Sequence, residues 1–410
     1  MISTPAHRRI LVVHTGHGPL RGSEKVVIRL IELLSPAYRF ALFTNHEALA
    51  KELAPHTAKA ILEPTLDDAA CDLSKPRTAL RLIWRLARLM KEQEIDLVHV
   101  NNGHATRLVH TATILRPTPI LTHLHAPLSR RTQIRLGIYS ADQIVGVAAF
   151  LGDVWSASPR IRRKIRTIYN AVDEAVVPDE AMRYFGGPTT QRPFTMATAS
   201  VLTEAKGVDM AIEAVRRLQH DGRTVRLLIL GSGPEDQHLR RIAEGLPVEF
   251  LGYRTDAISI IAAADALLLP SRRYEAHSIA LLEAGVAGVA RIAADIPGSQ
   301  EVITHGETGL LFRSGNVNDL AARIAVLMDD PTFACRLGAA GRNDVLQRFS
   351  SERFRCAFQD AYREVMALRP SRLGRLASLP VEAVAVLASL QAPRVPSEPV
   401  SRKRGIVHHL

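Results

Sequence analysis

Two glutamates eight positions apart, Glu275 and Glu283, are the side chains of this sequence best placed to do chemistry. The apolar run 266–269 predicts a buried strand that ends shortly before Glu275. A helix that begins near Ser278, a favourable N-cap residue, would carry Glu283 inside it. The chain would then present a carboxylate, free backbone N–H groups and a second carboxylate. Carboxylates suit sugar hydroxyls and a helix N-terminus suits a diphosphate, so this order predicts a sugar-nucleotide site.

The residues around the two glutamates make the pattern specific. They include Pro270-Ser271, Leu282-Glu283-Ala284, Gly288 and Gly298-x-x-Glu301. The segment resembles the donor-binding motif of retaining glycosyltransferases of the family 4 type (glycosyl transferases group 1). The resemblance extends from about residue 10 to residue 362. It implies an α/β fold of the GT-B class, with two facing Rossmann-like β/α/β domains, parallel sheets and a nucleotide-sugar cleft between them.

The composition is that of a globular protein. The chain has 410 residues, of which 47% are hydrophobic and 23% charged, enough for two hydrophobic cores. No apolar run approaches the roughly 20 residues that span a bilayer, and the first nine residues lead directly into an apolar strand, so we expect a cytoplasmic protein. The three scattered cysteines argue against a disulfide framework or a thiolate zinc site.

The formal net charge of +11 favours anionic partners. We do not expect nucleic acid, because the sequence has no motif of a nucleic-acid-binding fold. A nucleotide donor, a phosphorylated acceptor and peripheral contact with the anionic inner face of a membrane all fit the charge. An arginine-rich composition without a specific partner explains it equally well.

Apolar strand-like runs alternate with helical patterns, which predicts parallel sheets. In the first half, the predicted strands are 10–14, 39–43, 97–100, 120–123, 143–147 and 166–169, and the helices are 23–34, 78–91 and 106–115. In the second half, the strands are 194–197, 225–230, 248–251 and 266–269, and the helices are 208–220, 235–244, 257–263, 316–328, 333–348 and 351–367. The repeated alternation predicts two domains.

We expect the first, acceptor-side domain at 1–180 and the nucleotide-sugar-binding domain at 193–350, with a Gly- and Pro-containing linker at 181–192. By the family resemblance, a helix at 351–368 crosses back to the first domain. A basic, Pro-rich tail follows at 369–410. It is predicted to be a disordered extension, and the alternative is a short apolar anchor at an anionic membrane.

The resemblance also assigns residues to the donor diphosphate. Segment 199–209 matches a family stretch with an arginine and, five residues later, a Lys-Gly pair, both of which contact the diphosphate. Lys206-Gly207 is present, whereas Val201 stands at the arginine position. Arginines of nearby loops are candidates to supply the missing charge: Arg254, Arg272 and Arg273.

The Gly-rich segment 14–24 follows the first predicted strand and opens a helix at Ser23. Backbone N–H groups of Gly22 and Ser23 are expected to approach the donor. The family has two glycines here, and Arg21 replaces the first. If that position requires a positive φ, the arginine costs about 1 kcal/mol or more.

Other glycines and backbone groups are predicted to line the donor site. Gly231 and Gly233 are predicted to form a tight turn between a strand and a helix. A dinucleotide site is not expected here, because it would require a fuller GxGxxG motif. Gly252 lies in a loop that, by resemblance, approaches the base. Ser278 and Ile279 offer backbone N–H groups to the diphosphate. Ala276-His277-Ser278 replaces the family's Gly-Phe-Gly, which predicts a bulkier and more polar sugar pocket.

The resemblance implies that Glu275 contacts sugar hydroxyls, that Glu283 contacts ribose hydroxyls and that Glu301 braces the site. The family commonly has a histidine at the position of His123, facing the transferred sugar, and His125 is a weaker candidate. Two histidines at i and i+2 also suggest a metal, but no third ligand is evident. The predicted catalytic residues are therefore His123, Glu275 and Lys206, without a metal or cofactor.

The leading hypothesis is transfer of a sugar from a nucleotide sugar to a glycan or lipid-linked acceptor with retention of configuration. No side chain stands out as a covalent nucleophile, which favours front-face transfer. The alternative is a catalytically impaired binding or scaffold subunit of the same fold, motivated by Val201 and Arg21. A nicotinamide-dependent oxidoreductase is disfavoured because the full GxGxxG fingerprint is missing.

Overall fold

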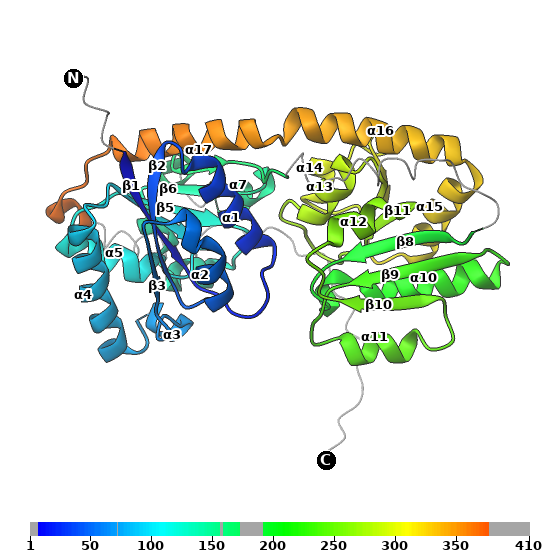
Figure 1. Ribbon diagram of the computed structural model, residues 1–410, viewed down its shortest axis with the longest axis horizontal. Helices are drawn as coiled ribbons and strands as arrows, with labels where there is room; N and C mark the ends of the chain where they lie inside the picture. The colour runs from blue at the N-terminus through cyan, green and yellow to red at the C-terminus, as the bar shows by residue number, and fades with distance from the viewer. Residues whose placement is uncertain (1–6, 72, 156–158, 173–191, 377–410) are drawn as a thin grey trace, which may run out of the picture.

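The computed structural model describes residues 7–71, 73–155, 159–172 and 192–376 of the chain. Nearly all of the predicted linker 181–192, and the tail beyond residue 376, lie outside the described residues. The described residues form two halves, each built on one parallel sheet with helices on both faces (Figure 1). This arrangement confirms the predicted α/β, GT-B fold class.

The first half contains a seven-stranded parallel sheet in the order β3-β2-β1-β4-β5-β6-β7. Apolar, largely β-branched runs form its buried central strands, as expected for a sheet covered on both faces. The strands are β1 (Arg8–His14), β2 (Tyr38–Thr44), β3 (Lys59–Leu62), β4 (Leu97–Asn101), β5 (Ile120–Leu124), β6 (Gln143–Gly146) and β7 (Ile165–Thr167). In the centre, β1 pairs with β4 so that Ile10 lies beside Leu97 and His14 beside Asn101.

Helices cover both faces of the first sheet. They are α1 (Gly22–Leu34), α2 (Glu47–Leu53), α3 (Asp68–Cys71), α4 (Pro76–Glu92), α5 (Thr106–Leu115), α6 (Arg130–Arg135), α7 (Ala149–Trp155) and α8 (Pro159–Arg162). α4 and α5 pack on one face through Leu82, Leu86 and Leu108. α1 and α2 pack on the other face through Val27 and Leu49.

The second half contains a six-stranded parallel sheet in the order β10-β9-β8-β11-β12-β13. Its strands are β8 (Phe194–Ala199), β9 (Val225–Leu230), β10 (Val248–Gly252), β11 (Ala266–Leu269), β12 (Ala290–Ala294) and β13 (Leu310–Phe312). Its helices are α10 (Val208–His220), α11 (Asp236–Ile242), α12 (Ala257–Ala262), α13 (Ile279–Val286), α14 (Ser299–Val302), α15 (Val317–Asp329) and α16 (Pro331–Arg348). The strand-before-helix order places the carboxyl ends of these strands at one edge, where α/β folds bind ligands.

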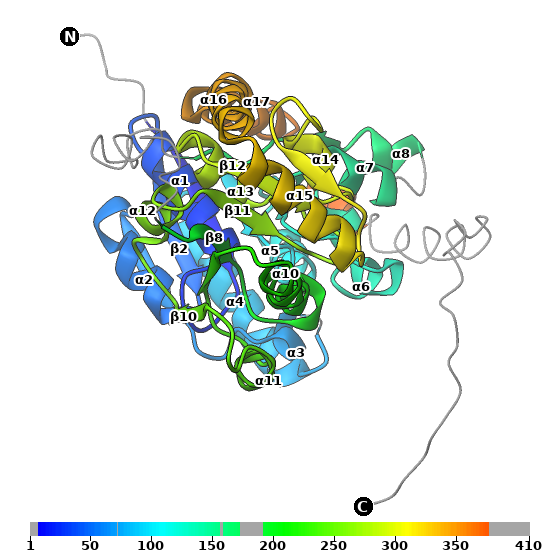
Figure 2. The same ribbon diagram turned by 90° about the vertical axis from the view of Figure 1, so that its right-hand side faces the viewer.

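The last helix, α17 (Ser351–Met366), follows the second half in sequence but packs on the first. Phe354, Phe358 and Tyr362 are buried in the core that contains Ile10 and Val12 of β1. Figures 1 and 2 show α16 and α17 along one edge of the molecule, running from the second half across to the first. The apolar side chains of α17 pack into the core of the first half, so this helix connects the second half to the first.

Three short strands were not predicted from the sequence: β3, β12 and β13. β3 is an edge strand with exposed and half-buried residues and so lacks the apolar run of a central strand. β12 is made of small residues around Arg291 and resembles the adjacent helical segment in composition. Such runs have no clear period, and tertiary pairing decides their conformation.

Candidate active site

A cavity of about 330 Å³ lies between the two halves. Segments that follow the carboxyl ends of strands line it from both sides. The first half contributes residues 19–23 and Lys25 after β1 and His125 after β5. The second half contributes Val201 after β8, Gly231 after β9, and the segment from Tyr274 to Ala280 after β11. The structure therefore brings together the two parts of the chain that the sequence indicated.

Glu275 and Lys206 form an ion pair on the wall contributed by the second half. Lys206 Nζ lies 2.6 Å from Glu275 Oε1, and Ser271 Oγ donates a hydrogen bond to the same oxygen. Glu275 is only 5% exposed, so its charge requires these partners. Its second oxygen, Oε2, takes no part in these contacts and remains available to accept hydrogen bonds.

Two glycines let the chain pack closely enough to position this pair. Gly207 has φ +63°, and a Cβ there would lie 2.1 Å from the carbonyl oxygen of Pro270 at the end of β11. Gly298 has φ +87°, and a Cβ there would lie 1.4 Å from the carbonyl oxygen of Glu275. A side chain at either position would displace backbone that carries the ion pair, which explains the Lys-Gly and Gly-x-x-Glu patterns.

The N-terminus of α13 opens into the cavity beside Glu275. Ser278 occupies the N-cap position, as predicted, but its side chain makes no capping hydrogen bond. Backbone N–H groups of the first turn, including those of Ile279 and Ala280, therefore lack a side-chain cap. Uncapped N–H groups and the helix dipole create a site for an anionic group.

Glu283 lies one turn further along α13 and is paired across the cavity. Its Oε1 lies 2.8 Å from Nζ of Lys25, which belongs to α1 of the first half. A second contact between the halves is the hydrogen bond from Tyr253 Oη to the carbonyl oxygen of Leu20, at 3.0 Å. No local sequence pattern indicates Lys25 as the partner of Glu283, because the two residues are 258 positions apart.

The N-terminal loop turns into α1 at Arg21, the N-cap residue. Arg21 has φ −107°, in the extended region, so this position does not require a positive φ and the arginine carries no such cost. The backbone N–H of Arg21 donates to Glu24 Oε2 at 3.0 Å, and this contact closes the first turn. Gly22 and Ser23, which we predicted to approach the donor, line the cavity.

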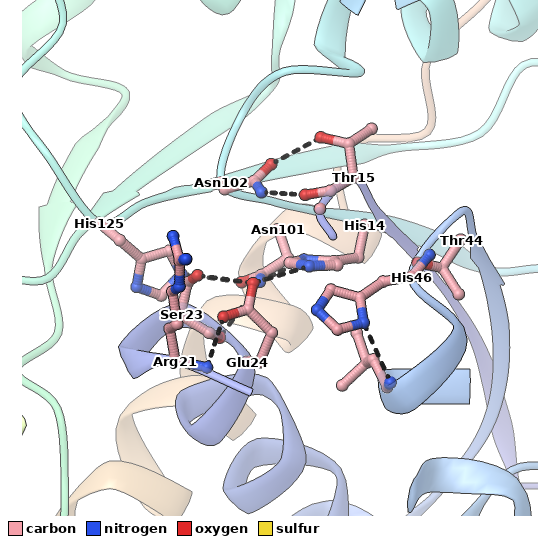
Figure 3. A network of polar contacts seen from close by, with 12 residues as sticks. His14, Thr15, Arg21, Ser23, Glu24, Thr44, His46, Asn101, Asn102 and His125 are labelled. Carbon is pink, nitrogen blue, oxygen red and sulfur yellow. Dashed lines mark hydrogen bonds and ion pairs between the residues drawn. The ribbon is translucent and has the colours of Figure 1, made fainter. Parts of the chain in front are cut away.

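A network of buried polar side chains supports this loop (Figure 3). His125 Nε2 lies 2.8 Å from Asn101 Oδ1, Asn101 Nδ2 lies 2.9 Å from His14 Nδ1, and His14 Nε2 lies 3.0 Å from Glu24 Oε1. Because an amide oxygen only accepts and an amide nitrogen only donates, this order places the proton of His125 on Nε2. Nδ1 of His125 is then an acceptor.

Charges in this network are set by burial and by the neighbouring groups. Burial is the main cause that lowers the pKa of His125 to about 3, so its imidazole is neutral. Burial alone would raise the pKa of Glu24, but contacts with His14, Ser23 and the Arg21 backbone outweigh it and lower the pKa to about 2. Glu24 is therefore a buried carboxylate that fixes the start of α1.

The structure does not bring His123 to the cavity. Its ring is fully buried between His99, His125 and Phe358, and neither ring nitrogen has a hydrogen-bond partner in the described residues. His123 lies within β5, which ends at Leu124, whereas His125 is the first residue after the strand and lines the cavity. His125, the weaker candidate from the sequence, is the histidine that lines the cavity.

Two other predicted residues, Gly233 and Gly252, do not line the cavity, whereas His277 does. Gly233 and Gly252 stand behind its wall, and the N–H of Gly231 donates to the carbonyl oxygen of Gly252 at 2.7 Å. His277 packs its ring between Tyr169 and Phe349 and buries both ring nitrogens. The bulkier and more polar sugar pocket expected from residues 276–278 stays a prediction.

The three candidate arginines differ in position. Arg254 lines the cavity and pairs with Asp256, with Nε 2.8 Å from Oδ1. Arg272 turns away and forms a two-pronged ion pair with Asp209. Arg273 is exposed and does not line the cavity.

Glu301 lies at the junction of the two halves. Its carboxylate accepts hydrogen bonds from the backbone N–H groups of Ala149 and Phe150, at 2.7 and 3.0 Å. These groups begin α7, where a helix favours negative charge. Glu301 therefore joins the second half to the first and does not line the cavity.

Within residues 7–71, 73–155, 159–172 and 192–376, no group of three His, Cys, Asp or Glu side chains is arranged to hold a metal ion. Across the same ranges, every helix is too short or too polar to cross a lipid bilayer.

Both halves of the chain match models of known families. Residues 20–176 match the model described as Glycosyltransferase Family 4, and residues 193–330 match the model described as Glycosyl transferases group 1. The first match ends at residue 176 and the second begins at residue 193, so each match covers one half of the structure. They cover most of the residues that line the cavity.

Curated relatives and solved structures agree with the family models. The chain is 26% identical over 321 residues to N-acetyl-alpha-D-glucosaminyl L-malate synthase of Bacillus anthracis, covering 73% of this chain and 82% of the relative. It is 26% identical to the lipopolysaccharide core biosynthesis glycosyltransferase LpsD of Rhizobium meliloti, covering 70% and 81%. HepE of Anabaena, solved in complex with UDP-glucose, has the same fold, with a TM-score of 0.74, 20% identity, and coverage of 87% and 100%. The chain belongs to the group 1, family 4 glycosyltransferases.

Proposed function

We propose that the chain transfers a sugar from a nucleotide sugar to a hydroxyl of a glycan or glycolipid, with retention of anomeric configuration and without a metal ion. One observation carries the proposal. Two nearly buried carboxylates, Glu275 and Glu283, flank the uncapped N-terminus of α13 in a single cavity. The carboxylates match the hydroxyls of the two sugars in the donor, and the helix N-terminus matches the diphosphate between them.

In this proposal, each group has a separate task. Glu275 accepts hydrogen bonds from the transferred sugar, and Glu283 accepts them from the ribose in place of its bond to Lys25. Lys206 and the α13 N-terminus stabilise the negative charge that develops on the leaving diphosphate. His125, neutral and with Nδ1 as an acceptor, binds a further sugar hydroxyl. His123, which we predicted for that task, supports His125 from the core.

The proposed mechanism is front-face transfer. Both carboxylates of the cavity wall are held in ion pairs with lysines, which suits binding better than attack on carbon. The bond between the anomeric carbon and the phosphate oxygen breaks, and the acceptor oxygen bonds to the same face. The acceptor proton passes to the departing phosphate oxygen, so charge and atoms balance. Lys206 and the helix dipole supply the neutralising charge, and the step therefore requires no metal.

The test is the anomeric configuration of the product. Purified protein is incubated with UDP-, GDP- and ADP-sugars and a glycan or glycolipid acceptor, and the new linkage is read by NMR. We expect the configuration of the donor, together with a large loss of rate in Glu275→Gln and none in Glu307→Gln, an exposed glutamate outside the cavity. An inverted product would contradict the mechanism.

We also propose that the chain contacts an anionic membrane through α4. The notable feature is the exposed face of this helix, where Leu80 and Trp84 are 57% and 63% exposed. Four arginines are exposed on the same helix: Arg77, Arg81, Arg85 and Arg88. An apolar stripe with arginines beside it is typical of helices that lie in the interface of an anionic bilayer. This surface lies within the described residues. Most of the tail 369–410, which the sequence offered as an alternative membrane anchor, lies outside them.

A second candidate function is a donor-binding subunit that transfers no sugar. Val201 favours it, because an apolar residue stands in the cavity wall where the family has a phosphate-binding arginine. Release of nucleoside diphosphate in the presence of an acceptor separates the two candidates. Binding of a nucleotide sugar without turnover on any acceptor would favour the subunit.

A further inference from the structure

The replacement of an arginine by Val201 raises a question of charge. A nucleotide sugar brings a diphosphate into the cavity, and charge-assisted hydrogen bonds are the strong means of binding it. Val201 offers none. Lys206 is one cation for the diphosphate. A second cation must come from another part of the chain, or the protein binds the donor weakly.

Four cationic side chains of Lys and Arg line the cavity, and three of them have an acidic partner. Lys206 pairs with Glu275, Lys25 with Glu283, and Arg254 with Asp256. The fourth is Arg21, which forms no ion pair with any residue in the described part of the chain. Three of the four charges are thus neutralised, and Arg21 is left as the uncompensated positive charge of the cavity.

Arg21 also has a suitable position. It is the N-cap residue of α1, a helix of 13 residues whose first turn, with Gly22 and Ser23, faces the cavity. In Figure 3 its side chain extends from the start of α1 in the direction of His125. Arg21 therefore lines the cavity from the first half, whereas Val201 and Lys206 line it from the second half.

We propose that Arg21 binds the diphosphate of the donor and replaces, from the first half, the arginine that is absent at Val201. This proposal rests on the proposed function, because it concerns the same donor site. Its consequence is that donor binding uses charges of both halves, Lys206 from one and Arg21 from the other. A guanidinium can contact two phosphate oxygens at once, which a lysine cannot do with the same geometry.

The test is calorimetric titration of the full chain with UDP, GDP and ADP, and with uridine, guanosine and adenosine. We expect the preferred diphosphate to bind Arg21→Ala about 10- to 100-fold more weakly than wild type, as for loss of a charge-assisted hydrogen bond. Binding of the matching nucleoside is expected to be unchanged, because the nucleoside has no phosphate. Arg21→Lys should lose less affinity than Arg21→Ala.

Two further variants complete the test. Arg273→Ala removes an exposed arginine of the neighbouring loop and is expected to bind the diphosphate like wild type. Val201→Arg in the Arg21→Ala background is expected to restore diphosphate binding, because it returns a cation to the cavity. Equal thermal stability of all variants without ligand would show that they fold alike, as expected for exposed Arg21.

The outcomes separate this inference from the proposed function. Wild-type affinity for the diphosphate in Arg21→Ala would overturn the inference and leave the donor site intact. An equal loss for nucleoside and diphosphate would also overturn it, since Arg21 would then shape the cavity without contacting phosphate. If wild type binds none of the three diphosphates, the proposed function itself fails.

Discussion

At the scale of single residues, the site depends on carboxylates that are nearly buried and individually paired. Glu275 is 5% exposed and Glu283 is 9% exposed, and each has one lysine within 2.8 Å. A buried charge without a partner is costly, and each lysine supplies the partner and orients the carboxylate. Each ion pair uses Oε1 of the glutamate, so Oε2 takes no part in it and is available to accept hydrogen bonds.

The pair of Lys206 and Glu275 makes a stability prediction. Lys206→Met leaves the Glu275 carboxylate without its cation, and we expect a loss of roughly 1–3 kcal/mol in the free energy of unfolding. Glu275→Gln in that background removes the unpaired charge and should recover part of the loss, while transfer remains impaired. Urea denaturation of the two single variants and the double variant measures the coupling. Additive losses would show that the two side chains do not interact.

At the scale of elements, the two halves place the carboxyl ends of their strands around one cavity. Short helices begin at those ends, and α1 and α13 direct their first turns into it. The same construction leaves α4 on the outside of the first half. Its buried face holds the core through Leu82 and Leu86, and its other face remains exposed.

The exposed face of α4 makes a prediction about membranes. Leu80→Ser with Trp84→Ser should reduce partitioning onto vesicles that contain phosphatidylglycerol by about 10-fold or more, because two apolar side chains no longer enter the interface. Val326→Ser, at a half-exposed valine of α15 in the second half, is the matched control and should have no effect. The measurement is co-sedimentation with anionic and with neutral vesicles. Unchanged binding by the double variant would contradict the assignment of α4.

At the scale of the whole molecule, the buried histidines connect stability to pH. Burial is the first cause that lowers the pKa of each, to about 3 for His99, His125 and His277 and about 4 for His110. In the unfolded chain the same groups titrate near 6.5. Between about pH 6.5 and 4 the unfolded state therefore binds more protons than the folded state, and stability falls as the pH is lowered.

The expected effect is large. In this window, each of the four histidines lowers the free energy of unfolding by about 1.4 kcal/mol for each pH unit of acidification. Above pH 6.5 their contribution to stability is complete. We expect cooperative unfolding well above pH 4, with uptake of several protons. Urea denaturation at pH 7.5, 6.0 and 5.0 measures it. A free energy of unfolding that stays constant from pH 7.5 to 5.0 would contradict neutral burial.

Some features of the fold and of the site could be predicted from the sequence, and others could not. Strands with continuous apolar runs predicted parallel α/β sheets in two halves. The family resemblance implied the GT-B class and a common donor site for Glu275, Glu283 and Lys206, and all three line one cavity. The prediction that His123 contacts the sugar was wrong, because the sequence does not show where the strand ends. His123 lies inside β5 and is buried, and His125 follows the strand and lines the cavity. Lys25 and the free charge of Arg21 depend on contacts between the halves, which no local pattern contains.

The central claim is that the cavity between the halves binds a nucleotide sugar through Glu283 and Glu275. The most direct measurement is the thermal stability of wild type and Glu283→Ala against UDP-, GDP- and ADP-sugars, since a ligand that binds the folded state raises the unfolding temperature. We predict a selective rise with one nucleotide in wild type and a much smaller rise in the variant. No rise with any nucleotide sugar, or an equal rise in both proteins, would contradict the claim.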